Sequence, residues 1–248
     1  MEDAGVSIEK QQCAEDLRRH LKSARQLRLQ ASADPATGRH RMLLREWQAA
    51  RLGRTHAGLL ASPRYGQAAK FFLTDLYGPK DFSSRDEEVE RILPLLIRLL
   101  PATGLRTVAL AVEVDALTEE LDSAMVGELS RAGLIECIGE DSYAAAYRAV
   151  GFPEERNRQI RLIRQTGEAL DRLARKPLIS GLLRLMRGPA HVAGLGELHE
   201  FLDRGFNAFR GMGPAKEFLD SIDSKELALS ARLFAGAPDP FAEVAHTL

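Results

Sequence analysis

Residues 159–174 read QIRLIRQTGEALDRLA and carry the pattern that decides the fold. Ile160, Ile163, Gly167, Leu170 and Ala174 follow one another at spacings of three and four residues. This spacing places them on one face of an α-helix, which repeats every ~3.6 residues. Gly167 lies within that face, where its missing side chain allows a neighbouring helix to come close. The stretch therefore predicts a helix packed tightly against another helix.

Helical periodicity recurs along most of the chain, and no segment alternates as a strand would. We expect helices over residues 8–31, 39–60, 62–77, 84–100, 105–132 (as one helix or two), 143–150 and 224–234. Further helices are expected between the breaks at Pro177, Gly188-Pro189 and Gly211–Pro214. The sequence thus predicts an all-α fold, a single-domain multi-helix bundle of about nine or ten helices over residues 1–248, with loose termini at 1–7 and 236–248.

Local signals define several of these boundaries. Asp34-Pro35 is expected to end the first helix, within a loop at residues 32–38. Ser62-Pro63 is typical of a helix start. Ser84 and Glu87 form a capping box, while Pro94 is expected to kink or break the helix that follows it. A turn is expected at residues 101–104.

The composition is that of an ordinary globular chain. It has 248 residues, of which 45% are hydrophobic and 28% charged, and a formal net charge of -1. This balance excludes wholesale disorder and gives no overall attraction to nucleic acid or anionic membranes. Cys13 and Cys137 are too few for a disulfide framework. With a charged first segment and no stretch of the ~20 apolar residues that a membrane span needs, we expect a cytoplasmic protein.

Charge is unevenly distributed along the chain. Residues 18–64 hold eleven Lys/Arg and two Asp/Glu, residues 156–187 hold nine and two, and residues 75–140 hold six and fourteen. Basic helices could contact phosphates, but nucleic-acid-binding domains usually carry a basic surplus as a whole. We therefore expect charge pairing within the chain or between subunits, and consider a nucleic-acid partner less favoured.

The sequence contains no metal or cofactor motif. None of the six histidines forms a His-Glu-x-x-His or Glu-x-x-His motif, and Glu197 and His199 do not share a helix face. A phosphate-binding P-loop and a Gly-x-Ser-x-Gly nucleophile turn are both missing. We expect no metal site and no cofactor.

The densest polar group follows the apolar residues Phe71 and Phe72. A carboxylate at position 75 lies on or beside the apolar stripe of the expected helix, where burial would raise its pKa and suit acid–base chemistry. The other explanation is structural: these side chains cap a loop and a helix, and Arg85 forms an ion pair with Asp75. The candidate catalytic residues are Asp75, Tyr77, Asp81, Arg85 and Asp86.

A second group of residues could line a ligand pocket between helices. Arginine suits an anionic group, and aromatic and methionine side chains suit an apolar one, although both also fill ordinary cores. The candidate ligand-binding residues are Arg184, Arg187, Phe206, Phe209 and Met212.

Three segments carry a resemblance to a known family. They are FFLTDLYGPKDFSSRD at 71–86, QIRLIRQTGEALDRLARKPLI at 159–179 and LRLMRGPAHVAGLGELHEFLDRGFNAF at 183–209. With them the chain resembles a family of helical bacterial proteins without an established activity, over most of the chain after about Leu52. The resemblance implies a shared helical architecture and transfers no catalytic residue.

Two functions are compatible with these observations. The first is a binding protein that holds a partner protein, a second copy of itself, or a small anionic or apolar ligand between its helices, without catalysis. The alternative is an enzyme that uses the polar group at residues 75–86 on an anionic small molecule. An enzyme would bring those side chains to one concave pocket, whereas a binding protein would leave them as caps and surface pairs.

Overall fold

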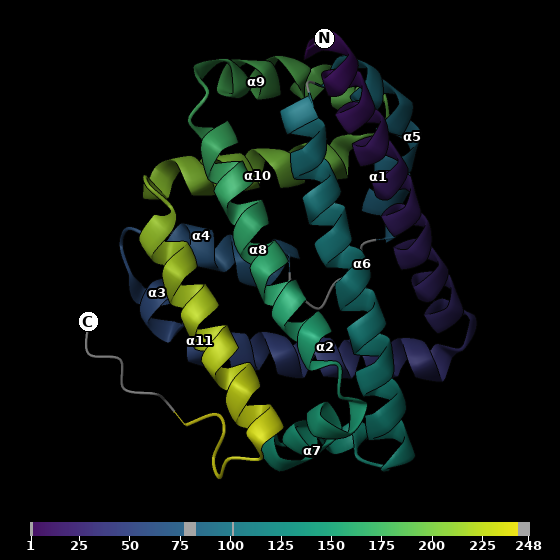
Figure 1. Cartoon of the computed structure of the whole chain (residues 1–248), viewed down its shortest axis with the longest axis vertical. Helices are drawn as coiled ribbons and strands as arrows, with labels where there is room; N and C mark the ends of the chain where they lie inside the picture. Colours follow the sequence, from purple (N-terminus) through teal and green to yellow (C-terminus); the bar gives the residue numbers. More distant parts are fainter. Residues whose placement is uncertain (1, 77–82, 101, 243–248) are drawn as a thin grey trace.

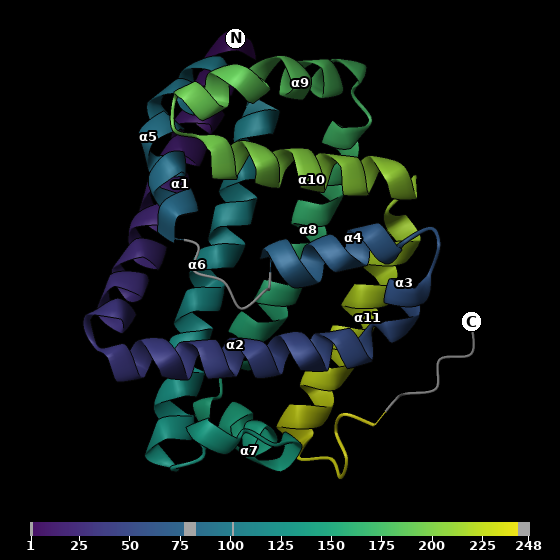
Figure 2. The ribbon, with the colours of Figure 1, turned by 180° about the vertical axis from the view of Figure 1, so that it is seen from behind.

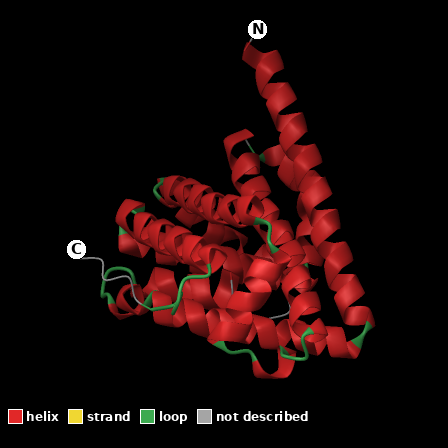
Figure 3. Cartoon of the chain, turned by 60° about the horizontal axis from the view of Figure 1, so that its bottom comes forward, coloured by secondary structure: helices red, strands yellow, loops and turns green. Residues whose placement is uncertain are grey.

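The computed structural model describes residues 2–76, 83–100 and 102–242. Within these ranges it describes all side chains except those of residues 2–7, 76, 83–86, 99, 177, 178 and 182. The described part contains helices and no strand, so the all-α prediction is confirmed (Figure 3). The eleven α-helices of this part are α1 (Glu2–Ala33), α2 (Pro35–Thr55), α3 (Ala57–Ala61), α4 (Gly66–Phe71), α5 (Ser83–Leu99), α6 (Ala102–Arg131), α7 (Glu140–Val150), α8 (Pro153–Ala174), α9 (Pro177–Val192), α10 (Gly196–Met212) and α11 (Lys216–Ala235).

The long helices form two crossed layers. In the first layer α6 lies between α1 and α8, and α8 lies between α6 and α11 (Figure 1). Seen from behind, α2, α4 and α10 run across these helices and form the second layer (Figure 2). A π-helical turn, η1 (Phe72–Leu76), continues α4, and a short 3₁₀ turn, η2 (Ile135–Cys137), precedes α7 at one end of the bundle.

The contact between α8 and α11 agrees with the predicted role of Gly167. A Cβ atom at this position of α8 would overlap the side chain of Leu219 on α11. Because a side chain at this position would displace the Leu219 side chain, the glycine lets Leu219 pack directly against the backbone of α8. The stretch that predicts helix packing in the sequence therefore forms the seam between α8 and α11.

Several helix boundaries differ from the prediction. The expected loop at 32–38 is much shorter, because the Asp34 side chain accepts hydrogen bonds from the backbone nitrogens of Ala36 and Thr37 and starts α2 at Pro35. The expected helix 39–60 ends at Thr55, and α3 follows separately. Near the C-terminus, α11 begins at Lys216, eight residues before the expected start at Ser224.

Two prolines do not end a helix. Helix α5 runs through Pro94 without a break, and α9 likewise runs through Pro189. The expected turn at 101–104 is wrong from Ala102 onward, since α6 begins there and continues as a single helix to Arg131. A proline removes one backbone donor, and packing along the rest of a helix can offset that loss.

Within the described residues, 2–7 and 236–242 are more ordered than the sequence indicates, while the rest of the expected loose termini lies outside the described residues. Helix α1 already begins at Glu2. Past α11, the Phe241 ring packs edge-on against Trp47, at 5.6 Å between ring centroids. Arg232 donates hydrogen bonds to the carbonyl oxygens of Asp239 and Ala242. The segment up to residue 242 is therefore held against the bundle.

The uneven charge is balanced inside the molecule, which confirms the expectation of pairing within the chain. The basic α1–α2 region faces acidic residues of α5, α6 and η2, and the basic α8 faces α6 and α11. Such pairs are Arg25–Glu90, Arg28–Asp115, Arg39–Glu136, Arg158–Glu113 and Arg164–Asp220.

Candidate functional site

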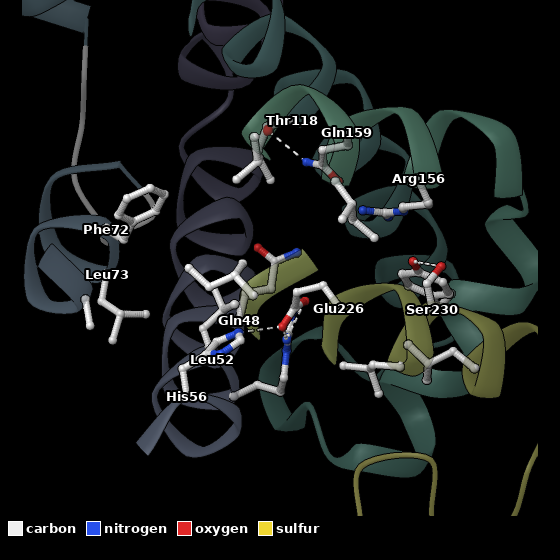
Figure 4. Close-up of a pocket in the computed structure, with 18 of the residues that line it drawn as sticks. Gln48, Leu52, His56, Phe72, Leu73, Thr118, Arg156, Gln159, Glu226 and Ser230 are labelled. Carbon is white, nitrogen blue, oxygen red and sulfur yellow. Dashed lines mark hydrogen bonds and ion pairs between the residues drawn. The ribbon is translucent and has the colours of Figure 1, made fainter. Parts of the chain in front are cut away.

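A cavity of about 130 Å³ lies between the two layers of helices. Helix α2 and the turn η1 line it from one layer, α6, α8 and α11 line it from the other, and α7 closes one end. Apolar side chains such as Phe72, Ile163 and Leu229 form much of the wall. Figure 4 shows several polar side chains reaching into the same space. We call this space the Arg156 cavity, after the residue that distinguishes it.

The cavity separates two parts of the hydrophobic core. On one side Leu44, Met125 and Tyr143 belong to a cluster between α2, α6 and α7. On the other side Phe72 and Phe218 belong to a cluster between η1, α10 and α11. Phe72 lies in a π-helical turn, a rare distortion that is found mostly at functional sites.

One end of the cavity holds a largely buried triad of Arg51, His56 and Glu226. The Arg51 Nη1 atom lies 2.6 and 2.7 Å from the two carboxylate oxygens of Glu226, and the His56 Nε2 atom lies 2.9 Å from Oε1. The three residues come from α2, from the cap that follows it and from α11, so the contact joins the two layers.

These contacts keep Glu226 ionised. Burial alone raises the pKa of a carboxyl, but the Arg51 charge, the His56 side chain and their hydrogen bonds outweigh it and lower the Glu226 pKa to about 2. Glu226 in turn raises the Arg51 pKa, although burial acts to lower it. Because an ionised carboxylate only accepts hydrogen bonds, His56 donates through Nε2. Its Nδ1 atom is buried and has no hydrogen-bond partner among the described residues.

Arg156 lies on the first turn of α8. Its backbone nitrogen donates a hydrogen bond to the carbonyl oxygen of Phe152, the residue at which the helix starts. Phe152 has a φ of 60°, in the left-handed region that bulky side chains seldom adopt, and Pro153 follows it. Local strain of this kind is concentrated at functional sites. A strained turn therefore sets the position of Arg156.

The guanidinium of Arg156 is buried without a carboxylate partner among the described residues. The residue is only 5% exposed, and its Nε and Nη2 atoms have no hydrogen-bond partner in the part of the chain that the structure describes. The guanidinium carbon lies 4.7 Å from the ring centroid of Tyr147, a contact that leaves the edge of the group open. In Figure 4 the group points toward the same space as the Gln48 side chain.

Several other polar groups of the cavity pair with one another, whereas Arg51 Nε, like His56 Nδ1, has no hydrogen-bond partner among the described residues. The amide of Gln159 donates to Thr118 over 2.8 Å, and the amide of Gln48 donates to Asp122 over 3.1 Å. The hydroxyl groups of Tyr147 and Ser230 lie 3.1 Å apart. Against this background, the unpartnered atoms of Arg156 and His56 stand out as groups that a ligand can satisfy.

Of the predicted catalytic candidates, the structure describes only the side chain of Asp75. Asp75 is buried, and its Oδ1 atom accepts hydrogen bonds from Arg204 at 2.7 and 3.0 Å. Its other oxygen accepts one from Thr74 at 2.8 Å. Tyr77 and Asp81 lie outside the described residues, as do the side chains of Arg85 and Asp86. The observed partner, Arg204, is on α10 and was not among the candidates.

The predicted ligand-binding residues do not line the Arg156 cavity. Arg184 and Arg187 lie on the exposed face of α9, where Arg187 is 3.6 Å from Asp203. Phe209 and Met212 are almost fully buried in the core, and Phe206 packs against the same cluster. Phe209 also borders a second hollow beside α8 and α10, but Arg184 and Arg187 do not line that hollow.

Sequence analysis missed the residues that the cavity brings together, although a signal for two of them exists. Arg156 lies four residues before Ile160 and so continues the apolar stripe of α8. Glu226 lies between Ile222 and Leu229 at the same kind of spacing. The argument that singles out Asp75, a charge on an apolar stripe, applies equally to both.

The described residues show no group of three His, Cys, Asp or Glu side chains arranged to hold a metal ion. In the same part of the chain, no helix combines the length and the apolar character that crossing a membrane requires.

Comparison with known families gives one match. Residues 27–240 match a family described as a domain of unknown function (DUF8198). The chain belongs to this family. Its limits include α2, which the resemblance seen in the sequence did not reach, and all the helices that line the Arg156 cavity. No curated protein and no solved structure matches the chain.

Proposed function

We propose that this protein binds a small organic anion in the Arg156 cavity and does not itself catalyse a reaction. One observation carries the proposal: a buried guanidinium that faces a cavity without a carboxylate partner among the described residues. Burying a charge alone costs several kcal/mol, so such a group is expected where a ligand supplies the opposite charge.

The two unpartnered atoms of Arg156 support an oxyanion as that ligand. Nε and Nη2 form one edge of the guanidinium, and that edge donates two parallel hydrogen bonds to a carboxylate or phosphate. The chain uses the same edge elsewhere, since Arg175 donates from Nε and Nη2 to the two oxygens of Asp171 at 3.3 and 2.8 Å. The apolar wall suits the remainder of an organic molecule.

The free cysteines Cys13 and Cys137 suit a reducing compartment and support the cytoplasm as the setting of this function. Self-association or binding to a partner protein remains a prediction from the sequence.

Thermal unfolding with added probes tests the proposal. Benzoate and phenyl phosphate are the anionic probes, and benzamide is the neutral one. A ligand at about 100 times its Kd adds about 2.7 kcal/mol of stability, which raises the Tm of a chain of this size by roughly 5–10 °C. We expect at least one anion to do this and benzamide to have little effect.

The matched variants are Arg156→Met and Arg161→Met. Arg161 lies on the same helix with its side chain exposed, so its loss should leave the shift in Tm intact. Arg156→Met should abolish the shift. The proposal is wrong if neither anion stabilises the wild-type protein, or if the stabilisation survives in Arg156→Met.

A further inference from the structure

The Arg156 cavity has two polar ends. Glu226 and Ser230 are one turn apart on α11, about 6 Å along the helix axis. Glu226 binds Arg51 and His56 at one end. Ser230 binds the hydroxyl of Tyr147, whose ring contacts Arg156, at the other end. A ligand that fills the space between them meets a different set of hydrogen-bonding atoms at each end.

The Arg156 end calls for one negative charge. Among the described residues, Glu226 is already balanced by Arg51, and Asp122 lies 3.7 Å from Arg45. Arg156 therefore brings a single positive charge without a described counter-charge. A monoanion neutralises it. A dianion would leave one negative charge over, close to the Glu226 and Asp122 carboxylates that also line the cavity.

The opposite end calls for a group that both donates and accepts hydrogen bonds. The Nε–H of Arg51 is a buried donor without a partner among the described residues. The Nδ1 of His56 is equally buried, and it is an acceptor when Nε2 carries the proton that faces Glu226. Both side chains bind the same carboxylate, which keeps them together. A hydroxyl group satisfies one donor and one acceptor at the same time.

The volume limits the body of the ligand. A buried apolar cavity of about 150 Å³ accepts a benzene ring, and the Arg156 cavity measures about 130 Å³. The ligand body should therefore be about the size of one six-membered ring, which also spans a distance of the order of one helical turn.

From these observations, and resting on the proposed function, we infer that the ligand is a hydroxylated monocarboxylate with a compact apolar body. Its carboxylate lies on the Nε–Nη2 edge of Arg156. Its hydroxyl group accepts a hydrogen bond from Arg51 Nε and donates one to His56 Nδ1. Phe72 and Ile163 pack against the body between the two ends.

Calorimetric titration of the whole protein with four probes tests this inference. The probes are 4-hydroxybenzoate, benzoate, 4-hydroxybenzamide and phenyl phosphate, which in turn carry both groups, lack the hydroxyl, lack the charge and double the charge. We expect 4-hydroxybenzoate to bind at least about tenfold more tightly than each of the others, the ratio that one buried hydrogen bond or charge contact supplies.

A substitution at the hydroxyl end adds a second test. In His56→Phe the advantage of 4-hydroxybenzoate over benzoate should fall to less than about threefold, while its advantage over 4-hydroxybenzamide remains. His191→Phe, at an exposed position on α9, is the control and should change neither ratio. If His56→Phe does not fold, the four titrations of the wild-type protein still test the contacts at both ends of the ligand.

The outcomes separate this inference from the proposed function. Equal binding of benzoate and 4-hydroxybenzoate would overturn the hydroxyl contact, and tighter binding of phenyl phosphate would overturn the monoanion; in both cases the cavity would still bind anions. Binding by none of the four probes would overturn the inference together with the proposed function.

Discussion

Two buried arginine sites in this molecule differ in how their charges are balanced. The first joins α1, α2 and α6 and centres on Glu119, which is 1% exposed. It consists of Arg28, Arg41, Arg45, Asp115, Glu119 and Asp122, and we call it the Glu119 cluster. Each of its guanidinium groups contacts a carboxylate of α6. In the Arg156 cavity, by contrast, no described carboxylate pairs with Arg156.

The difference shows what a buried charge does in each place. Three carboxylates spaced along one face of α6 hold two other helices in register, so the Glu119 cluster is part of the architecture. Arg156 joins no helices through an ion pair among the described residues. This fold can enclose a paired set of charges, and this contrast is why we propose that the open edge of Arg156 binds a ligand.

The largest expected effect is in the Glu119 cluster. Glu119→Gln leaves three guanidinium groups with only two carboxylates in a buried site, and the loss should be about 3–5 kcal/mol of unfolding free energy. Urea unfolding followed by circular dichroism measures it. The neighbouring exposed Glu120 supplies the control, since Glu120→Gln should change stability by less than about 0.5 kcal/mol. Equal effects of the two substitutions would show that the Glu119 cluster does not stabilise the fold.

The second prediction concerns pH at the paired end of the cavity. The Glu226 pKa is about 2 in the folded protein, below the ordinary glutamate value of 4.5 that we take for the unfolded chain. Because the folded value is lower, Glu226 stabilises the fold above pH 4.5, and this contribution is lost as the pH falls from 4.5 toward 2. The difference corresponds to roughly 3 kcal/mol.

Urea unfolding between pH 2.5 and 7 on the wild type and on Glu226→Gln isolates this contribution. The variant should lose less stability on acidification, since it has no proton to take up at this site. Parallel stability curves for the two proteins would show that the triad does not lower the Glu226 pKa.

An intermediate case lies at Asp75. The carboxylate is buried, but the side chain of its partner Arg204 is 50% exposed, so solvent screens part of the interaction. Asp75→Asn should lower the unfolding free energy by about 1–2 kcal/mol. The double variant with Arg204→Ala should lose less than the sum of the two single variants. Arg210→Ala, an exposed arginine on the same helix, is the control.

If Asp75→Asn is as stable as the wild type, the structural interpretation of this residue fails. That result would favour the alternative function, an enzyme that uses the polar group at residues 75–86.

The smallest expected effect has the opposite sign. Arg156→Met replaces a buried charge that has no described carboxylate partner by an apolar side chain of similar length, and should raise the unfolding free energy by about 1 kcal/mol. Arg161→Met should leave it within about 0.5 kcal/mol. A loss of stability in Arg156→Met would mean that its contact with Tyr147 holds the fold together, and the contrast with the Glu119 cluster would disappear.

Much of the fold can be predicted from local patterns. The stripe from Ile160 to Ala174 predicts α8 and, through Gly167, the close approach of a neighbouring helix, which the structure identifies as α11. Prolines were less reliable guides, because α5 and α9 continue through Pro94 and Pro189. The backbone donor that a proline removes is a local loss, whereas the packing that keeps the helix continuous comes from elsewhere in the chain.

The candidate site was much harder to predict. Asp75 was correctly identified as a charge in an apolar setting, but its described partner is Arg204, 129 residues away. Arg51 and Glu226 are separated by 175 residues, and nothing near either of them in the sequence indicates the other. Pairing between distant charges depends on how the layers cross, which a pattern read along one helix does not contain.

The sequence by itself determined the helical class, the seam at Gly167 and the segregation of basic and acidic segments that later pair. These properties depend on neighbours within a few residues, where the geometry of the helix is known in advance. Only the tertiary structure decided which buried charges are matched and which are left open. Glu119 and Arg156 are both charged residues on buried helix faces, and the difference between them arises from the helices that pack opposite each one.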